Sequence, residues 1–136
     1  MPTNAPARIA AIVLAIEGLG ILALAGWQVV ALAGGDAESV VSGIALIVLT
    51  IVGAAAVLAF AAATWRSASW GRSGGIVTQL LILAVAVGAM TGAYAHPLVG
   101  ALLAVPAVVG LVPLFLAVRR AAAQKAAEKK DADASR

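Results

Sequence analysis

Four long runs of apolar residues, separated by short polar segments, make up most of this chain. They cover about residues 9–33, 39–63, 76–94 and 98–118. A bilayer core about 30 Å thick is crossed by about 20 helical residues, so each run can span a membrane once. The second run is apolar on every side of a helix, as expected for a helix surrounded by lipid. The pattern predicts an all-α membrane protein, an antiparallel four-transmembrane-helix bundle.

Short polar segments mark the predicted turns. Residues 34–35 are both glycine, which breaks a helix easily, and Asp36 and Glu38 follow them. Ser39 is a suitable N-cap for the second helix. The third turn, a His-Pro pair at residues 96–97, is very short. The first and third turns therefore connect neighbouring spans directly.

The central loop, residues 64–75, has the sequence TWRSASWGRSGG and is the longest internal loop that the pattern predicts. Tryptophan prefers the headgroup level of a bilayer, and arginine prefers the cytoplasmic side. We therefore interpret Trp65, Arg66, Trp70 and Arg72 as interfacial anchors. A docking site for a partner protein is the alternative interpretation of this loop.

Composition excludes most other classes of protein. The 136 residues are 63% hydrophobic and 11% charged, and their mean hydropathy is +1.07, so they do not provide the surface of a soluble domain. With no cysteine and one histidine, we expect no disulfide, haem or metal site and no cofactor. The sequence contains no Ser/His/Asp set, no paired catalytic carboxylates and no phosphate-binding glycine loop, so we expect no enzymatic activity.

Positive charge is confined to three segments of the chain. All nine Lys and Arg residues lie in an N-terminal arm (1–8), the central loop (64–75) or a basic tail (119–136). The positive-inside rule then places both termini in the cytoplasm, and we expect a plasma-membrane protein whose basic segments face anionic lipid. This distribution follows membrane topology and does not favour nucleic acid. We expect the Ala-rich tail to extend the last helix briefly and then fray.

One carboxylate lies inside the first apolar run. Glu17 is nine residues after Arg8, about 13 Å along a helix, and so lies within the hydrocarbon. Such a group is costly there unless it faces other helices, finds a partner or is protonated. Gln28 falls within about 20° of Glu17 on the helix, and Gly20 lies on the neighbouring edge. We therefore expect Glu17, Gly20 and Gln28 to face the bundle.

Two groups on later helices lie at the depth of Glu17. Gln79 is about 10 Å of helix from Arg72. Pro113 leaves the carbonyl of Val109 without its helical donor. This carbonyl lies at about the same level, because Val109 is about 15 Å from the basic tail. We expect the three groups to meet in one layer, where a neutral Glu17 donates to this carbonyl and the Gln79 amide accepts or donates beside it. Glu17, Gln28, Gln79 and Pro113 are therefore a candidate intramembrane polar site. The last helix is expected to bend along the stripe of Pro106, Gly110 and Pro113.

Small residues form a ridge on the third run. Ala84, Gly88 and Gly92 recur every four residues, a spacing that lets a second helix approach closely. Gln79 lies about opposite the ridge on the same helix. We expect the ridge to pack against another helix. The alternatives are a helix of this chain, a helix of a partner membrane protein and a helix of a second copy in a homodimer.

The pattern resembles that of small, Ala- and Val-rich four-span membrane proteins of actinobacteria. The resemblance covers most of the chain and includes the first-helix Glu17, the Arg/Trp-rich TWRSASWGR and the VTQLL that contains Gln79. A weaker resemblance, limited to Glu17 and the number of spans, links the chain to the small multidrug resistance transporters. That second resemblance implies proton-coupled export of hydrophobic cations. The expected role is an accessory or scaffold component of a membrane complex, and the alternative is a small proton-coupled transporter that uses Glu17.

Overall fold

The computed structural model describes residues 5–35, 38–93 and 95–135. Within these ranges the protein has four α-helices and no strand. Each helix contains a stretch that is long and apolar enough to cross a membrane, which indicates a multi-pass membrane protein. The predicted all-helical fold and the number of helices are therefore confirmed. The helices are α1 (Ala5–Ala33), α2 (Val40–Trp65), α3 (Ser69–Thr91) and α4 (Pro97–Ala134).

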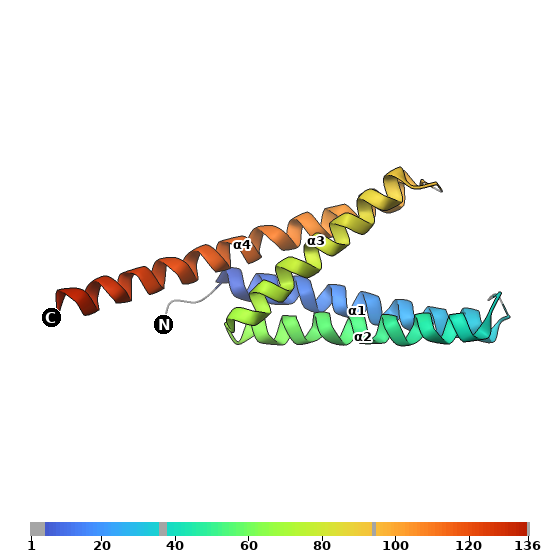
Figure 1. Ribbon diagram of the computed structural model, residues 1–136, viewed down its shortest axis with the longest axis horizontal. Helices are drawn as coiled ribbons and strands as arrows, with labels where there is room; N and C mark the ends of the chain where they lie inside the picture. The colour runs from blue at the N-terminus through green and yellow to red at the C-terminus, as the bar shows by residue number, and fades with distance from the viewer. Residues whose placement is uncertain (1–4, 36–37, 94, 136) are drawn as a thin grey trace.

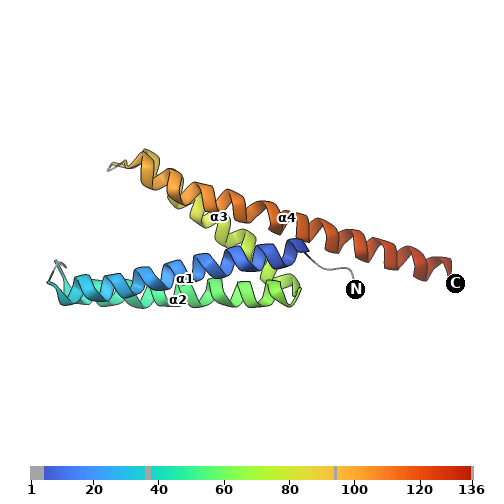
Figure 2. The ribbon, with the colours of Figure 1, turned by 180° about the vertical axis from the view of Figure 1, so that it is seen from behind.

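The four helices form two hairpins, α1 with α2 and α3 with α4 (Figure 1). The hairpins meet where α1 begins, α2 ends and α3 begins, and they diverge toward their other ends, as both views show (Figures 1 and 2). We call the part in which they meet the basal half, comprising residues 5–18, 54–79 and 107–121. The outer half comprises residues 19–33, 40–53, 80–91 and 97–106.

The first turn has the local signals that its sequence predicts. Gly35 has a φ of +83°, a left-handed conformation that glycine adopts without steric cost, and it follows the last turn of α1. On the other side of the turn, the Ser39 hydroxyl accepts a hydrogen bond from the Ser42 N–H at 3.4 Å and caps α2. Asp36 lies outside the described residues.

The central loop is much shorter than the sequence predicts. Only residues 66–68 separate α2 from α3, because α3 begins at Ser69 and not near residue 76. A Cβ on Gly71 would lie 2.5 Å from the Thr64 backbone nitrogen, and one on Gly74 would meet the Phe60 ring. These glycines therefore allow α3 to pack closely on α2, and reading them as loop residues was wrong.

Both chain ends are more helical than expected. The structure begins α1 at Ala5, inside the predicted arm, with Pro6 in the first turn, where a proline costs no hydrogen bond. Helix α4 continues without interruption to Ala134, so the prediction that the tail frays soon after residue 118 was wrong. Alanine has the highest helix propensity, which accounts for this extension. The helix also continues through Pro106 and Pro113.

The apolar core lies in the basal half. Leu14 and Leu114 are fully buried and cluster with Ala10, Val57 and Ala61. Large apolar side chains of all four helices are exposed in both halves, as expected for surfaces that face lipid. Among the described residues, the largest fully buried side chains, by contrast, lie where the hairpins meet.

Candidate functional site

Three helices meet first in an apolar layer. Leu14 of α1 and Leu114 of α4 converge on Gly75 of α3. A Cβ on Gly75 would lie 2.9 Å from Leu14 Cδ1 and 3.0 Å from Leu114 Cδ2, so a larger residue does not fit without displacing them. This layer brings α1, α3 and α4 close enough for polar side chains one turn further along to touch.

A polar layer follows one helical turn toward the outer half. Gln79 lies four residues after Gly75, Glu17 three residues after Leu14, and Gly110 four residues before Leu114. Gln79 Nε2 donates a hydrogen bond to Glu17 Oε2 at 2.5 Å. This bond joins α1 to α3 and hence one hairpin to the other.

Gly110 gives the amide of Gln79 its space. A Cβ on Gly110 would lie 2.6 Å from Gln79 Nε2 and 2.8 Å from Gln79 Cδ. The Gln79 side chain is 0% exposed, so α1, α3 and α4 together enclose it. Any side chain at position 110 would displace the donor of the hydrogen bond to Glu17.

Three oxygen atoms of the predicted polar site are buried without a hydrogen-bond partner among the described residues. They are Glu17 Oε1, Gln79 Oε1 and Gln28 Oε1. A buried polar atom without a partner costs about 1–3 kcal/mol. These three oxygens can therefore still accept hydrogen bonds, and accepting them would be favourable. Two of the three atoms belong to the pair that joins the hairpins.

The bond predicted between Glu17 and the carbonyl freed by Pro113 is not formed. Glu17 Oε1 has no partner, and Oε2 accepts the bond from Gln79. Pro113 itself is buried in α4. The carbonyl belongs to Val109, whose neighbour Gly110 contacts the Gln79 amide instead. The depth counted along each helix correctly predicted that Glu17, Gln79 and the segment around Val109 lie at similar levels. It did not predict which atoms form the hydrogen bond.

The inward face of α1 differs from the predicted stripe. Gly20 is exposed, and a Cβ on it would meet nothing within 4 Å, so its inward assignment was wrong. Glu17 and Gln28 are half-buried at the edge of the packed face. Gln28 lies in the outer half, 11 residues beyond Glu17. The buried positions of α1 follow a spacing of three and four residues, the repeat of closely packed helix pairs. They are Ala7, Ala11, Leu14, Gly18 and Ala25, together with Pro6 and Ala10.

Among the described residues, the predicted small-residue ridge makes no close contact with another helix. Ala84, Gly88 and Gly92 are exposed. A Cβ on Gly88 would meet nothing within 4 Å, and one on Gly92 would meet only the Gly88 backbone. Helices α3 and α4 approach closely at Gly100 instead, where a Cβ would lie 2.8 Å from the Ala86 carbonyl oxygen.

The predicted interfacial anchors gather around the turn between α2 and α3. The Arg8 guanidinium lies 5.4 Å from the centre of the Trp65 ring, in cation–π contact. The Trp70 and Phe60 rings pack edge to face at 6.0 Å. Arg72 Nη1 donates a 2.7 Å hydrogen bond to the Ser67 carbonyl oxygen. The fourth predicted anchor, Arg66, is the C-cap of α2.

Sequence reasoning missed the glycines that build the site. Gly71, Gly75 and Gln79 are spaced by four residues on α3, as are Gly110 and Leu114 on α4. This spacing could have indicated a close three-helix contact around Gln79. Among the described residues, no group of three or more His, Asp and Glu side chains is placed to hold a metal ion.

Comparison with family models, curated proteins and solved structures finds no match to this chain. The resemblances to actinobacterial four-span proteins and to small multidrug resistance transporters are therefore unsupported. The interpretation of the site depends on its own geometry.

Proposed function

We propose that this chain is a four-span plasma-membrane protein that acts as an accessory or scaffold component of a membrane complex. The observation that carries the proposal is the form of the outer half, where the hairpins diverge (Figure 1). There α3 carries the ridge of Ala84, Gly88 and Gly92, which has no close contact from another helix within the described part of the chain. Small residues allow a partner helix to approach closely where lipid provides no hydrophobic drive.

The proposed orientation places the basal half at the cytoplasmic face. Every Lys and Arg lies in the predicted arm, the central loop or the tail, so the positive-inside rule gives cytoplasmic termini and an antiparallel arrangement of spans. The basic tail would then lie near anionic lipid, with about 1 kcal/mol of attraction per basic residue.

This orientation can be tested with single cysteines because the natural sequence has none. We expect an impermeant maleimide to label His96→Cys in intact cells. We expect Ser135→Cys to react only after the membrane is permeabilised. Labelling of Ser135→Cys in intact cells would contradict the proposed orientation.

In this proposal Glu17 and Gln79 join the two hairpins. One proton on the carboxyl group of Glu17 would let it donate to Gln79 Oε1 while Oε2 continues to accept from Gln79 Nε2. Both unpaired oxygens would then be satisfied by a closed ring of two hydrogen bonds. Glu17→Gln can form the same ring of hydrogen bonds with its amide, so this link between the hairpins does not require a group that ionises.

The accessory role predicts a partner on the ridge side of α3. A photoreactive residue is placed at Leu81, one turn from Ala84 and 63% exposed. Its control is at Leu49 of α2, which is 69% exposed. We expect cross-linking in cells to give one adduct of defined mass from position 81 and none from position 49. A lone homo-oligomer, or equal cross-linking at both positions, would contradict the accessory role.

A proton-coupled transporter is the second candidate. It is favoured by one observation, that Glu17 is half-buried and its Oε1 atom has no hydrogen-bond partner in the part of the chain that the structure describes. An ionisable group within a span is a functional candidate by default. In proteoliposomes, transport predicts release of protons when a hydrophobic cation is added, and loss of this release in Glu17→Gln. The accessory role predicts no release from either protein.

A further inference from the structure

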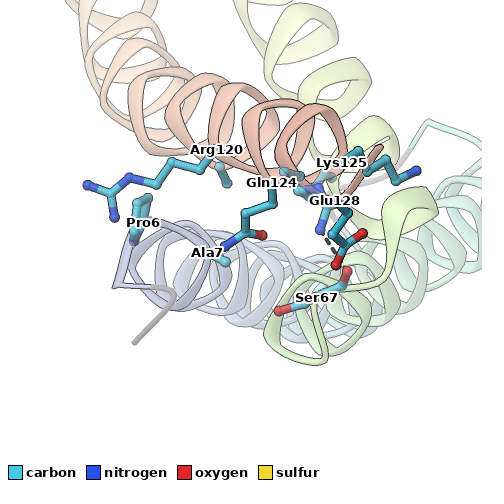
Figure 3. Close-up of a pocket in the computed structure, with 10 residues that line it drawn as sticks. Pro6, Ala7, Ser67, Arg120, Gln124, Lys125 and Glu128 are labelled. Atoms are coloured by element: carbon cyan, nitrogen blue, oxygen red, sulfur yellow. Dashed lines mark hydrogen bonds between the residues drawn. The ribbon is translucent and has the colours of Figure 1, made fainter. Parts of the chain in front are cut away.

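A hollow of about 250 Å³ opens at the basal end of the molecule (Figure 3). The start of α1, the turn between α2 and α3, the first turn of α3 and residues 117–128 of α4 form its walls. Pro6, Ala7 and Ala117 are buried and provide its apolar lining. The hollow is much larger than the volume of about 30 Å³ that one water molecule occupies in the liquid.

The polar lining of this hollow is mainly cationic. Arg72, Arg120 and Lys125 contribute three positive charges, and Glu128 contributes one carboxylate. The Arg120 side chain extends past Pro6 and the Lys125 side chain extends to the opposite side, so these two cations flank the hollow (Figure 3). Gln124 of α4 points its amide between α1 and the turn (Figure 3). The lining thus combines an excess of positive charge with a neutral hydrogen-bonding group.

We propose that this hollow binds a phosphate group, and that its occupant is the headgroup of an anionic phospholipid. Guanidinium groups bind phosphate oxygens with two parallel hydrogen bonds, and a lysine adds a point charge. A phosphodiester also leaves room for the rest of a headgroup in a hollow of this size. The lipid assignment rests on the proposed membrane placement, which puts the hollow at the level of Trp65 and Trp70.

The N-terminus of α3 reinforces the proposal. Its N-cap, Ala68, makes no side-chain cap hydrogen bond. A second hollow of about 230 Å³ includes Ser69 from this first turn and shares Arg72 and Lys125 with the first. The positive end of the helix dipole therefore lies beside the cationic lining, where it favours an anion.

Substitutions of two further lining residues, Arg72 and Glu128, should have effects that differ from a simple loss of binding. Arg72 Nη1 bonds to the Ser67 carbonyl oxygen and so holds the turn, which means that replacing Arg72 would disturb the fold as well as the site. Glu128 would repel an anion in the hollow. Glu128→Gln should therefore bind phosphate more tightly than the natural protein does.

The decisive variants lie on one helix. Arg120→Gln with Lys125→Gln removes two charges from the hollow, whereas Lys129→Gln with Lys130→Gln removes two charges from α4 outside its lining. Binding of phosphatidylglycerol to each detergent-solubilised protein is measured by native mass spectrometry, with phosphatidylcholine as the neutral comparison. We expect about a tenfold loss for the first pair, equivalent to about 1.4 kcal/mol, and less than a twofold loss for the second.

Equal losses for the two pairs would overturn the proposal, because they would show general attraction to the tail. Absence of any preference for phosphatidylglycerol over phosphatidylcholine would also overturn it. A phosphate group in the hollow could come from a phospholipid headgroup or from a soluble ligand, and competition by inorganic phosphate distinguishes the two. If millimolar inorganic phosphate does not displace phosphatidylglycerol, the result supports the lipid headgroup. If it does, the result supports a soluble phosphate ligand. Circular dichroism of each variant checks that the helices remain folded. Because the measurement uses detergent, its result is independent of orientation and of any partner protein.

Discussion

The basal and outer halves are built from similar apolar residues but pack very differently. In the basal half, Gly75 admits Leu14 and Leu114, and Gly110 admits the amide of Gln79. In the outer half, Gly88 has nothing within 4 Å of the position of a Cβ. Hydrophobicity alone does not distinguish these regions, since lipid is as apolar as leucine. Small residues at matching depths on three helices, together with one polar pair, determine where the hairpins join.

This difference also separates the proposed roles of the two halves. The basal half contains the core and the Glu17–Gln79 bond, and the cationic hollow lies at its end, between it and the continuation of α4. The outer half contains the exposed ridge on α3. In our account the basal half fixes the fold and contacts lipid headgroups, while the outer half receives a partner helix.

The largest expected effect is that of filling the space at Gly75. Gly75→Val would place methyl groups against Leu14 and Leu114, and overpacking of this kind costs about 2–3 kcal/mol. The control is Gly88→Val on the same helix, with an expected change below about 0.5 kcal/mol. Unfolding in detergent, followed by circular dichroism, measures both. Equal losses would show that the two halves do not differ in packing.

A somewhat smaller effect is expected from removing a core side chain. Leu14 is 0% exposed and Leu19 is 57% exposed, so these leucines of α1 form a matched pair. Leu14→Ala should lower the free energy of unfolding by about 2 kcal/mol through the cavity that it leaves. Leu19→Ala should change it by less than about 0.5 kcal/mol. A loss of stability in Leu19→Ala as large as that in Leu14→Ala would place the core elsewhere.

The sequence predicted the number of helices, the position of the first turn and the segments that carry the polar pair. These features follow from the apolar length of each run, from helix-breaking glycines and from depth counted along a helix. The start of α3 was not predictable in the same way, because Gly71 and Gly74 can indicate either a loop or close packing. Only the contacts with Thr64 and Phe60 show which of the two applies.

The details of the candidate site depend on how the helices rotate and cross. Gly20 was assigned to the inward face because it lies beside Glu17 on a helical wheel, yet it is exposed. The packed face of α1 is centred on Leu14 and Gly18, with Glu17 at its edge. Likewise, Gln79 bonds to Glu17, whereas the Val109 carbonyl at similar depth does not. Depth does not specify orientation about the helix axis.

A smaller effect is expected at the interface between the basal half and water. Arg8 lies over the Trp65 ring, and exposed cation–π pairs contribute about 0.5–1 kcal/mol. Arg8→Gln should lower the unfolding free energy by about this amount in the natural protein and by much less in a Trp65→Phe background, because the phenylalanine ring binds cations less well. The same loss in both backgrounds would exclude the pair as its cause.

The most direct test of the account is a double-mutant cycle of Glu17 and Gln79, measured as the free energy of unfolding in detergent. Glu17→Leu and Gln79→Leu, singly and together, should show a coupling energy between about 0.6 kcal/mol, the average for hydrogen bonds between membrane helices, and about 1.7 kcal/mol, the maximum. Glu17→Gln should retain nearly natural stability because its amide can also pair with Gln79. Additive effects of the two leucine substitutions would contradict the claim that this bond joins the hairpins.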